Sequence, residues 1–123
     1  MAKILVVEDS LFQRLNITNI LKEKNYTFFE CSNGKDAMKK LSEEYFDCLL
    51  LDLLMPEFDG IEVLKNMKQF NINVPTIIMT ADIQETTKKE CFNMGAKDII
   101  NKPFKKEEVL NAIEKILNNS HSN

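Results

Sequence analysis

The sequence has few of the residues on which several classes of small protein depend. It contains three cysteines at wide spacing, Cys31, Cys48 and Cys91, and no cysteine or histidine lies beside them in metal-ligand register. This pattern excludes a disulfide framework and a zinc site, and favours reduced, buried thiols in a cytoplasmic protein. Only three glycines and three prolines occur in 123 residues, with no internal repeat or low-complexity stretch. A collagen-like or disordered chain is therefore excluded.

Long hydrophobic runs and an excess of positive charge are also missing. No apolar stretch approaches the roughly 20 residues needed to cross a membrane, and the first residues lead straight into a strand-like run. The net charge of −3 offers no basic surface for nucleic acid or an anionic membrane. The apolar fraction of 44% and the charged fraction of 28% are typical of a globular domain. We expect one domain over residues 1–118 and a disordered tail over residues 119–123.

Five apolar runs of strand length alternate with segments of helical periodicity. The predicted strands cover residues 3–7, 27–31, 47–51, 74–79 and 97–100. Alternating strands and helices with short connections predict a parallel sheet covered on both faces, because right-handed crossovers leave few other arrangements. The nearly continuous apolar runs of the first, third and fourth strands agree with burial on both faces. We therefore predict an α/β fold with a five-stranded parallel sheet flanked by five helices.

The spacing of polar and apolar residues predicts where helices start and which faces pack. Three segments match the capping box, in which two residues satisfy each other's backbone donors: Ser10 with Gln13, Asp59 with Glu62, and Asp82 with Glu85. The last helix has Lys105 at the expected cap, and Glu107 and Glu108 supply favourable charge instead. Apolar spacing predicts packing faces in the first and last helices, formed by Leu11, Leu15, Thr18 and Leu21 and by Val109, Leu110, Ile113, Ile116 and Leu117.

Polar side chains follow four of the five predicted strands. Glu8 and Asp9 follow the first strand, Asp52 the third, Thr80 the fourth and Lys102 the fifth. The carboxyl ends of parallel strands share one edge of a sheet, where doubly wound folds bind their ligands. Each residue alone has a plainer explanation, as a helix cap, a strand-end hydroxyl or a surface lysine. Because five such coincidences at four strand ends rarely arise by chance, we interpret these residues as one site.

Three carboxylates at one edge of the sheet repel one another. At about 4 Å and an effective dielectric constant of about 20, each like-charged pair costs about 4 kcal/mol before screening. A cation offsets this cost, and oxygen ligands without histidine or cysteine favour Mg²⁺ over zinc. We predict that Glu8, Asp9 and Asp52 hold Mg²⁺, directly or through water, with the backbone carbonyl of Leu54 as a further ligand.

A carboxylate beside Mg²⁺, an ammonium group and a hydroxyl donor is suited to accept a phosphoryl group. Asp52 lies at the centre of the predicted site, so we assign it as the nucleophile. Lys102 is predicted to pair with the phosphoryl oxygens, and Thr80 to donate its hydroxyl hydrogen once the group is attached.

Several short segments contain these residues: Val6-Val7-Glu8-Asp9-Ser10, Leu51-Asp52-Leu53-Leu54-Met55-Pro56 with Asp59-Gly60, Thr80-Ala81, Gly95-Ala96 and Lys102-Pro103-Phe104. Through them the sequence, from residue 3 to residue 117, resembles the receiver domains of response regulators in two-component signalling, in particular the single-domain chemotaxis type. The resemblance implies a flavodoxin-like, doubly wound sheet with strand order 2-1-3-4-5. It also implies phosphoryl transfer from a histidine kinase to Asp52, dependence on Mg²⁺ and a cis bond before Pro103.

The resemblance further implies a signal carrier rather than a turnover enzyme, since such domains slowly hydrolyse their own acyl phosphate. The implied partner is a downstream protein that binds the surface of the fourth helix, fifth strand and fifth helix, with no direct contact to nucleic acid or membrane. Ile99 departs from the family, in which an aromatic residue often swings inward on activation, so a switch here relies on Thr80 and the loop after it. Leu54 and Asp82 stand at the family positions that flank the attacking water. We predict that Leu54 restricts this water, and that Asp82 orients it unless it is engaged as a helix cap.

Other interpretations stay open beside the phospho-accepting module. One is a pseudo-receiver that binds partners without phosphorylation, and another is the receiver part of a longer regulator. A flavodoxin-like cofactor binder is disfavoured, because Glu8 and Asp9 stand where its phosphate loop would lie and would repel a phosphate.

Overall fold

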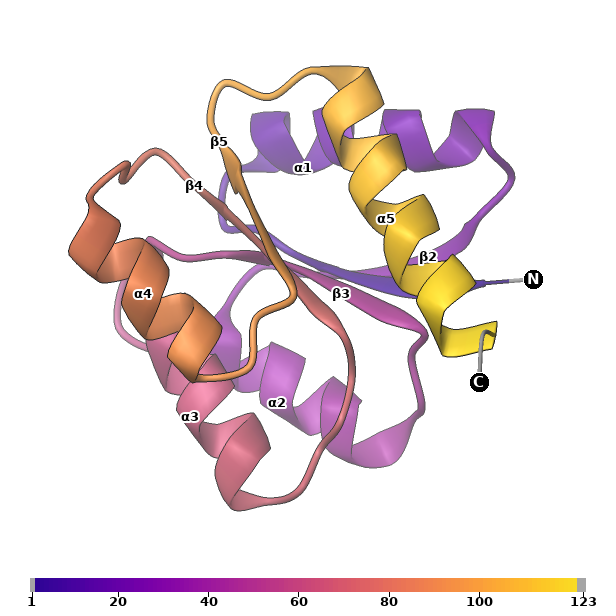
Figure 1. The fold of residues 1–123 in the computed structure, drawn as a ribbon. Helices are drawn as coiled ribbons and strands as arrows, with labels where there is room; N and C mark the ends of the chain where they lie inside the picture. Colours follow the sequence, from indigo (N-terminus) through magenta and orange to yellow (C-terminus); the bar gives the residue numbers. More distant parts are fainter. Residues whose placement is uncertain (1, 122–123) are drawn as a thin grey trace.

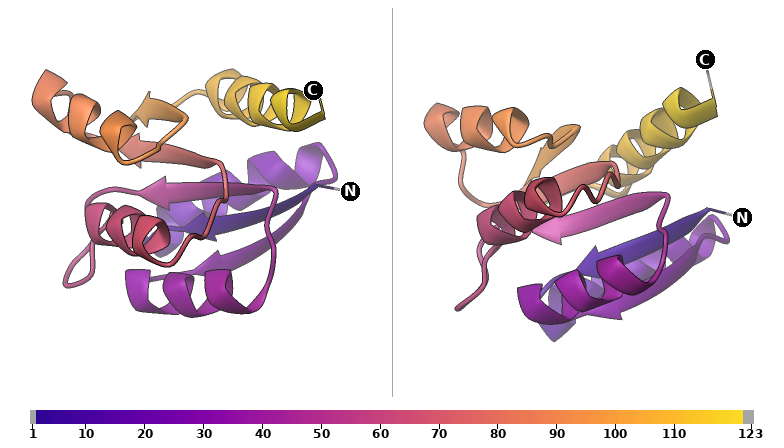
Figure 2. Two further views of the ribbon diagram at one scale, coloured as in Figure 1. Left: turned by 60° about the horizontal axis from the view of Figure 1, so that its bottom comes forward. Right: turned by 90° about the horizontal axis from the view of Figure 1, so that it is seen from below.

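The computed structural model describes residues 2–121 and confirms the predicted α/β class. Five parallel strands form one sheet in the order β2-β1-β3-β4-β5. The strands are β1 (Lys3–Val7), β2 (Thr27–Cys31), β3 (Cys48–Asp52), β4 (Thr76–Thr80) and β5 (Asp98–Asn101). The helices are α1 (Leu11–Glu23), α2 (Gly34–Glu43), α3 (Gly60–Gln69), α4 (Glu85–Asn93) and α5 (Lys106–His121). Figures 1 and 2 show α1 and α5 on one face of the sheet and α2, α3 and α4 on the other, as in a doubly wound fold.

The sheet separates two apolar cores. Successive residues of a strand point to opposite faces, so Leu49 and Leu51 pack with residues of α2 and α3, while Leu50 packs with residues of α1 and α5. All five residues of β3 are buried. Because each buried leucine contributes about 2 kcal/mol, this strand is a firmly held support for its last residue, Asp52.

Three strands differ by one or two residues from the predicted ranges. β3 and β4 end at Asp52 and Thr80, so each of these residues is the last of its strand rather than the first beyond it. β4 begins at Thr76 instead of residue 74, because Pro75 has no N–H to donate to the neighbouring strand. β5 covers residues 98–101 instead of 97–100.

One of the three predicted capping boxes is complete. At the start of α3, Glu62 N–H donates to Asp59 Oδ1 over 3.0 Å and Asp59 N–H donates to Glu62 Oε1 over 3.2 Å. At α1, Gln13 N–H donates to Ser10 Oγ over 3.3 Å, but the reciprocal bond is missing. Ser10 N–H donates instead to the carboxylate of Glu8 over 3.1 Å, so half of this box is replaced by a contact to the predicted site.

The third predicted capping box is wrong. The N-cap residue of α4 is Gln84, and its side chain makes no capping hydrogen bond. The carboxylate of Asp82 accepts hydrogen bonds from Gln84 N–H and from the Thr87 hydroxyl, which leaves no reciprocal pair with Glu85.

The predicted packing face of α1 is correct only in its second half. Thr18 and Leu21 are buried, whereas the side chains of Leu11 and Leu15 are 63% and 48% exposed. In the first turns of α1, the side of the helix that faces the sheet carries polar residues. One of them, Arg14, donates a hydrogen bond to the backbone at the end of β1. The leucines on either side of these residues are therefore left on the surface.

The packing face of α5 is as predicted. Val109 and Ile113 are fully buried, and Leu110 and Ile116 are nearly so. The helix continues to His121, past the predicted domain end at residue 118, so residues 119–121 of the expected tail are helical. Residues 122 and 123 lie outside the described part of the chain. The cysteines are free thiols, with Cys48 and Cys91 buried and Cys31 half-buried.

Candidate functional site

The ends of β1, β3 and β5 bring four of the predicted site residues together at one edge of the sheet. Glu8, Asp9 and Asp52 each offer a carboxylate oxygen, and these oxygens lie within 4.8 Å of one another. Glu8 and Asp52 are buried, with 1% and 4% exposure, whereas Asp9 is exposed. The ammonium group of Lys102 lies 2.9 Å from Glu8 Oε1 and 3.2 Å from Asp52 Oδ1.

Asp52 is held by its strand and by the loop that follows it. Leu54 N–H donates to Asp52 Oδ1 over 3.3 Å, and Gly60 N–H donates to the carbonyl of Leu53 over 3.0 Å. A Cβ atom on Gly60 would lie 2.7 Å from the carbonyl oxygen of Asp52 and 2.8 Å from Cα of Leu53. Only glycine therefore allows α3 to begin directly against the end of β3 and close this loop.

Glu8 is positioned by a side chain that the sequence did not reveal as part of the site. The guanidinium of Arg14 donates to the backbone carbonyl of Glu8 over 2.6 Å and to the carboxylate of Glu30 over 3.1 Å. Glu8 N–H donates to the carbonyl of Cys31 over 3.1 Å. Arg14 thus ties the end of β1 to the end of β2. The one feature of the sequence that could have indicated this role is a basic residue four positions after the N-cap of α1, on the side of the helix that faces the sheet.

Lys102 follows β5, which lies on the other side of β3 from β1, so it approaches Asp52 from the side opposite Glu8. Its backbone N–H donates to the carbonyl of Thr80 over 2.8 Å, which fixes the end of β5 against β4. The Lys102–Pro103 peptide bond is cis, as the resemblance implied. The lysine side chain is 15% exposed, so its charge is exerted largely within the protein.

The buried charges do not balance. Burial, and after it the nearby charge of Glu8, raise the pKa of Asp52 from 3.8 to about 7, although Lys102 opposes both effects. Without another cation, Asp52 is only partly ionised near neutral pH. One ammonium group serves two buried carboxylates and the adjacent Asp9. Oxygen ligands with surplus negative charge fit a hard divalent cation such as Mg²⁺. Among the side chains that the structure describes, within residues 2–119, this is the one cluster of at least three such ligands.

Thr80 and Asp82 lie in a hydrogen-bonded loop beside this cluster. Thr80 is 1% exposed, ends the strand adjacent to β3, and accepts a hydrogen bond from Asp82 N–H over 3.0 Å at its hydroxyl oxygen. Its hydroxyl hydrogen is left to donate, since a hydroxyl group is both donor and acceptor. The Asp82 carboxylate is engaged by Gln84 and Thr87. Asp82 is not the N-cap residue of α4, but these two hydrogen bonds engage its carboxylate, so the role predicted for it in orienting a water stays a prediction.

Leu54 and Ile99 occupy different environments. Leu54, whose N–H bonds Asp52, is 58% exposed. Ile99 is half-buried and packs against the core on the side of α2, α3 and α4, opposite Ile78 in β4.

Comparison with known proteins agrees with this geometry. The family model for the response regulator receiver domain matches residues 4–114. The chain belongs to the response-regulator receiver family. The receiver is 38% identical over 117 residues to the chemotaxis protein CheY of Bacillus subtilis, covering 94% of this chain and 98% of that protein. It is 37% identical to the transcriptional regulatory protein CrdR of Helicobacter pylori, covering 94% of this chain but 55% of that protein.

Solved structures of receiver domains share the fold. The receiver domain of the Francisella response regulator 1452 is 28% identical, with a TM-score of 0.93 and coverage of 98% of this chain and 99% of that chain. The strand order implied by the resemblance is thus confirmed both in this receiver and by its structural relatives. No helix within residues 2–121 is long and apolar enough to span a membrane.

Proposed function

We propose that this receiver domain accepts a phosphoryl group on Asp52 from the phosphohistidine of a histidine kinase. The observation that carries the proposal is a buried carboxylate at a strand end, flanked by two further carboxylates and by an ammonium group at 3.2 Å. Glu8, Asp9, Asp52 and the backbone carbonyl of Leu54 would hold Mg²⁺. When bound, the ion supplies positive charge that keeps Asp52 ionised and offsets charge on the phosphoryl oxygens.

The residues of the site divide the work of transfer. One carboxylate oxygen of Asp52 forms a bond to phosphorus while the bond between phosphorus and the donor's imidazole nitrogen breaks, and the nitrogen keeps the electron pair. Lys102 balances charge on the transferred oxygens, and Thr80 donates its hydroxyl hydrogen to one of them. Slow hydrolysis of the resulting acyl phosphate returns the domain to its starting form. Because this step is slow, the domain acts as a signal carrier rather than as a turnover enzyme.

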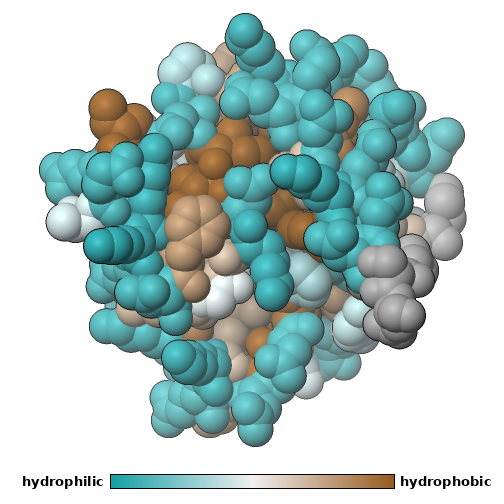
Figure 3. Space-filling model, in the orientation of Figure 1, coloured by the Kyte–Doolittle hydropathy of each residue, from teal (hydrophilic) through white to brown (hydrophobic). Residues whose placement is uncertain are grey.

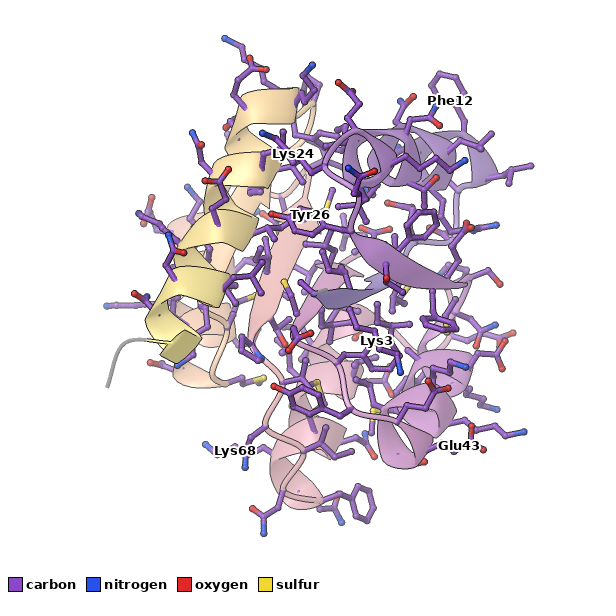
Figure 4. All side chains as sticks on the ribbon, turned by 90° about the vertical axis from the view of Figure 1, so that its right-hand side faces the viewer. Lys3, Phe12, Lys24, Tyr26, Glu43 and Lys68 are labelled. Atoms are coloured by element: carbon purple, nitrogen blue, oxygen red, sulfur yellow. The ribbon has the colours of Figure 1, made fainter. Side chains whose placement is uncertain are left out.

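The kinase has an apolar surface available close to Asp52. Leu11, Phe12 and Leu15 are 63%, 72% and 48% exposed at the start of α1, directly after the acidic pair. Figure 4 shows Phe12 projecting outward from this helix. A donor domain that packs on these side chains would bring its histidine to the carboxyl edge of the sheet.

The downstream partner is a protein that binds the surface formed by α4, β5 and α5. Figure 3 shows this side of the molecule, where apolar side chains gather among hydrophilic ones. Ile83, in the loop before α4, is 68% exposed, and Phe92, near the end of that helix, is 48% exposed. Such side chains suit a protein interface better than a nucleic acid. We expect the domain to act in the cytoplasm, as predicted from its cysteines.

A pseudo-receiver that never accepts phosphate is the competing interpretation. The complete set of Glu8, Asp9, Asp52, Thr80 and Lys102 argues against it, because a binding-only domain gains nothing from burying charges that oppose its own folding.

Acetyl phosphate with Mg²⁺, followed by intact mass measurement, tests the proposal. We expect one added phosphoryl group in the wild type and none in Asp52→Asn. Asp98→Asn is the matched control, since Asp98 lies at the opposite end of the sheet and should be labelled like the wild type. An unlabelled wild type, or a labelled Asp52→Asn, would refute the proposal.

A further inference from the structure

The loop between β4 and α4 is held by polar contacts rather than by burial. Ala81, Ile83 and Gln84 are exposed, and the Ile83 side chain is 68% exposed. In α4 itself, Cys91 is the one fully buried residue. A segment with so little apolar contact opens at low free-energy cost unless hydrogen bonds restrain it.

Asp82 makes three such hydrogen bonds. Its carboxylate accepts from Gln84 N–H over 2.9 Å and from the Thr87 hydroxyl over 2.9 Å, and its own N–H donates to the Thr80 hydroxyl over 3.0 Å. The N-cap residue Gln84 makes no side-chain capping bond, so Asp82 and Thr87 together stabilise the start of α4. One residue thereby joins the first turn of α4 to the hydroxyl group beside Asp52.

The inference rests on the proposed phosphoryl transfer, in which Thr80 donates its hydroxyl hydrogen to the phosphoryl group. The hydrogen bond from Asp82 N–H to the Thr80 hydroxyl opposes that role. If the Thr80 hydroxyl turns toward a phosphoryl group on Asp52, Asp82 N–H loses its acceptor unless the loop follows. A lost partner for a backbone donor is costly, so the loop is expected to move with Thr80. The bond from Thr87 to the Asp82 carboxylate holds the loop where it is and resists that movement.

We propose that Thr87, acting through Asp82, is a positioning residue that keeps the Thr80 hydroxyl bonded to its own loop and thereby weakens the hold of the site on a phosphoryl group. A contact made in one conformation only stabilises that conformation, and it lowers the apparent affinity of any ligand that needs the other. The Thr87 hydroxyl bonds Asp82, which is neither the phosphoryl acceptor nor a proposed metal ligand, so its effect is exerted through the loop.

Beryllofluoride, a non-covalent phosphoryl mimic, measures this effect at equilibrium. Its apparent affinity in the presence of Mg²⁺ is measured by calorimetry for the wild type, Thr87→Val, Thr87→Ser and Thr86→Val. Because one hydrogen bond to a carboxylate is lost, we expect Thr87→Val to bind the mimic about three- to tenfold more tightly. Thr87→Ser keeps the hydroxyl and should match the wild type. Thr86→Val makes the same change at the preceding, exposed position and should also match it.

A double-mutant cycle separates this positioning role from a general loss of structure. Asp82→Ala, which removes the carboxylate that Thr87 contacts, should tighten binding in the same direction, and adding Thr87→Val to it should cause little further change, because both substitutions break one contact. Affinity for Mg²⁺ alone should stay the same in all variants. The inference is overturned if Thr87→Val binds the mimic no more tightly than the wild type, or if Thr86→Val reproduces its effect. If the wild type itself binds no beryllofluoride, the proposed function fails as well.

Discussion

At the scale of single residues, the site depends on the cost of burying Asp52. Burial disfavours the charged form of a carboxylate, and the raised pKa of Asp52 is the result of this cost. The sequence predicted Glu8, Asp9, Asp52 and Lys102 as neighbours because each follows an apolar run of strand length. It could not reveal the contact of Arg14 with the carbonyl of Glu8, since no spacing rule relates a helix side chain to a particular backbone oxygen.

Lys102 is predicted to stabilise the fold as well as the site. Lys102→Met leaves Glu8 and Asp52 facing each other without a positive charge. In buffer free of divalent ions at about pH 8, we expect the unfolding free energy to fall by about 2 kcal/mol, less than for a fully buried pair because protonation of Asp52 relieves part of the repulsion. Urea denaturation measures the change. Lys105→Met, at an exposed position, is the control. Equal losses in both variants would contradict the assignment.

Leu54 is predicted to prolong the life of the phosphorylated form. Leu54 lies two residues after Asp52 and is exposed, and its apolar side chain offers no hydrogen bond to an attacking water. We expect phosphorylated Leu54→Asn to lose its phosphoryl group several-fold faster than the wild type, as followed by intact mass after removal of the donor. Leu15→Asn changes an exposed leucine on α1 and should decay at the wild-type rate. An unchanged decay in Leu54→Asn would refute this role.

At the scale of helices and strands, local patterns succeeded where no tertiary contact competed with them. The capping box at Asp59 formed as predicted, whereas Ser10 gave its N–H to Glu8, and Asp82 turned to Gln84 and Thr87. At α1 the carboxylate of Glu8 took the N–H of Ser10, and before α4 the carboxylate of Asp82 bonds Gln84 and Thr87 in place of the expected pair with Glu85. The departures from local rules therefore gather around the carboxyl edge of the sheet, where function competes with local preference.

Gly60 tests how tightly α3 closes the loop after Asp52. Gly60→Ala would place a Cβ atom against the backbone of Asp52 and Leu53, which cannot move aside like the end of a flexible side chain. We expect a loss of about 2 kcal/mol in unfolding free energy, together with slower labelling by acetyl phosphate because the end of β3 is displaced. Lys65→Ala, at an exposed position in the same helix, should change neither. A fully stable, fully labelled Gly60→Ala would contradict this account.

At the scale of the whole molecule, alternating strands and helices were enough to predict the layers and the edge that carries the site. They were not enough to predict strand order, because pairing between parallel strands is non-local and leaves no periodic signal within any one strand; the order came from the family resemblance. The fold joins residues that are far apart in the chain, with Lys102 contacting both Glu8 and Asp52. The two buried carboxylates repel each other and oppose folding. If Mg²⁺ binds there as proposed, metal binding and stability are expected to be linked in this receiver.

The most direct test of that linkage is the unfolding free energy of the wild type minus that of Asp52→Asn, measured against pH with and without millimolar Mg²⁺. The pKa of Asp52 is raised in the folded protein, from 3.8 to about 7, so its contribution to stability is complete below about pH 4 and is lost as the pH rises through about 7. Without Mg²⁺ we predict that the difference falls across this range. With Mg²⁺ the fall should disappear, because the ion binds the ionised carboxylates of the folded state. Identical pH profiles with and without Mg²⁺ would contradict the account.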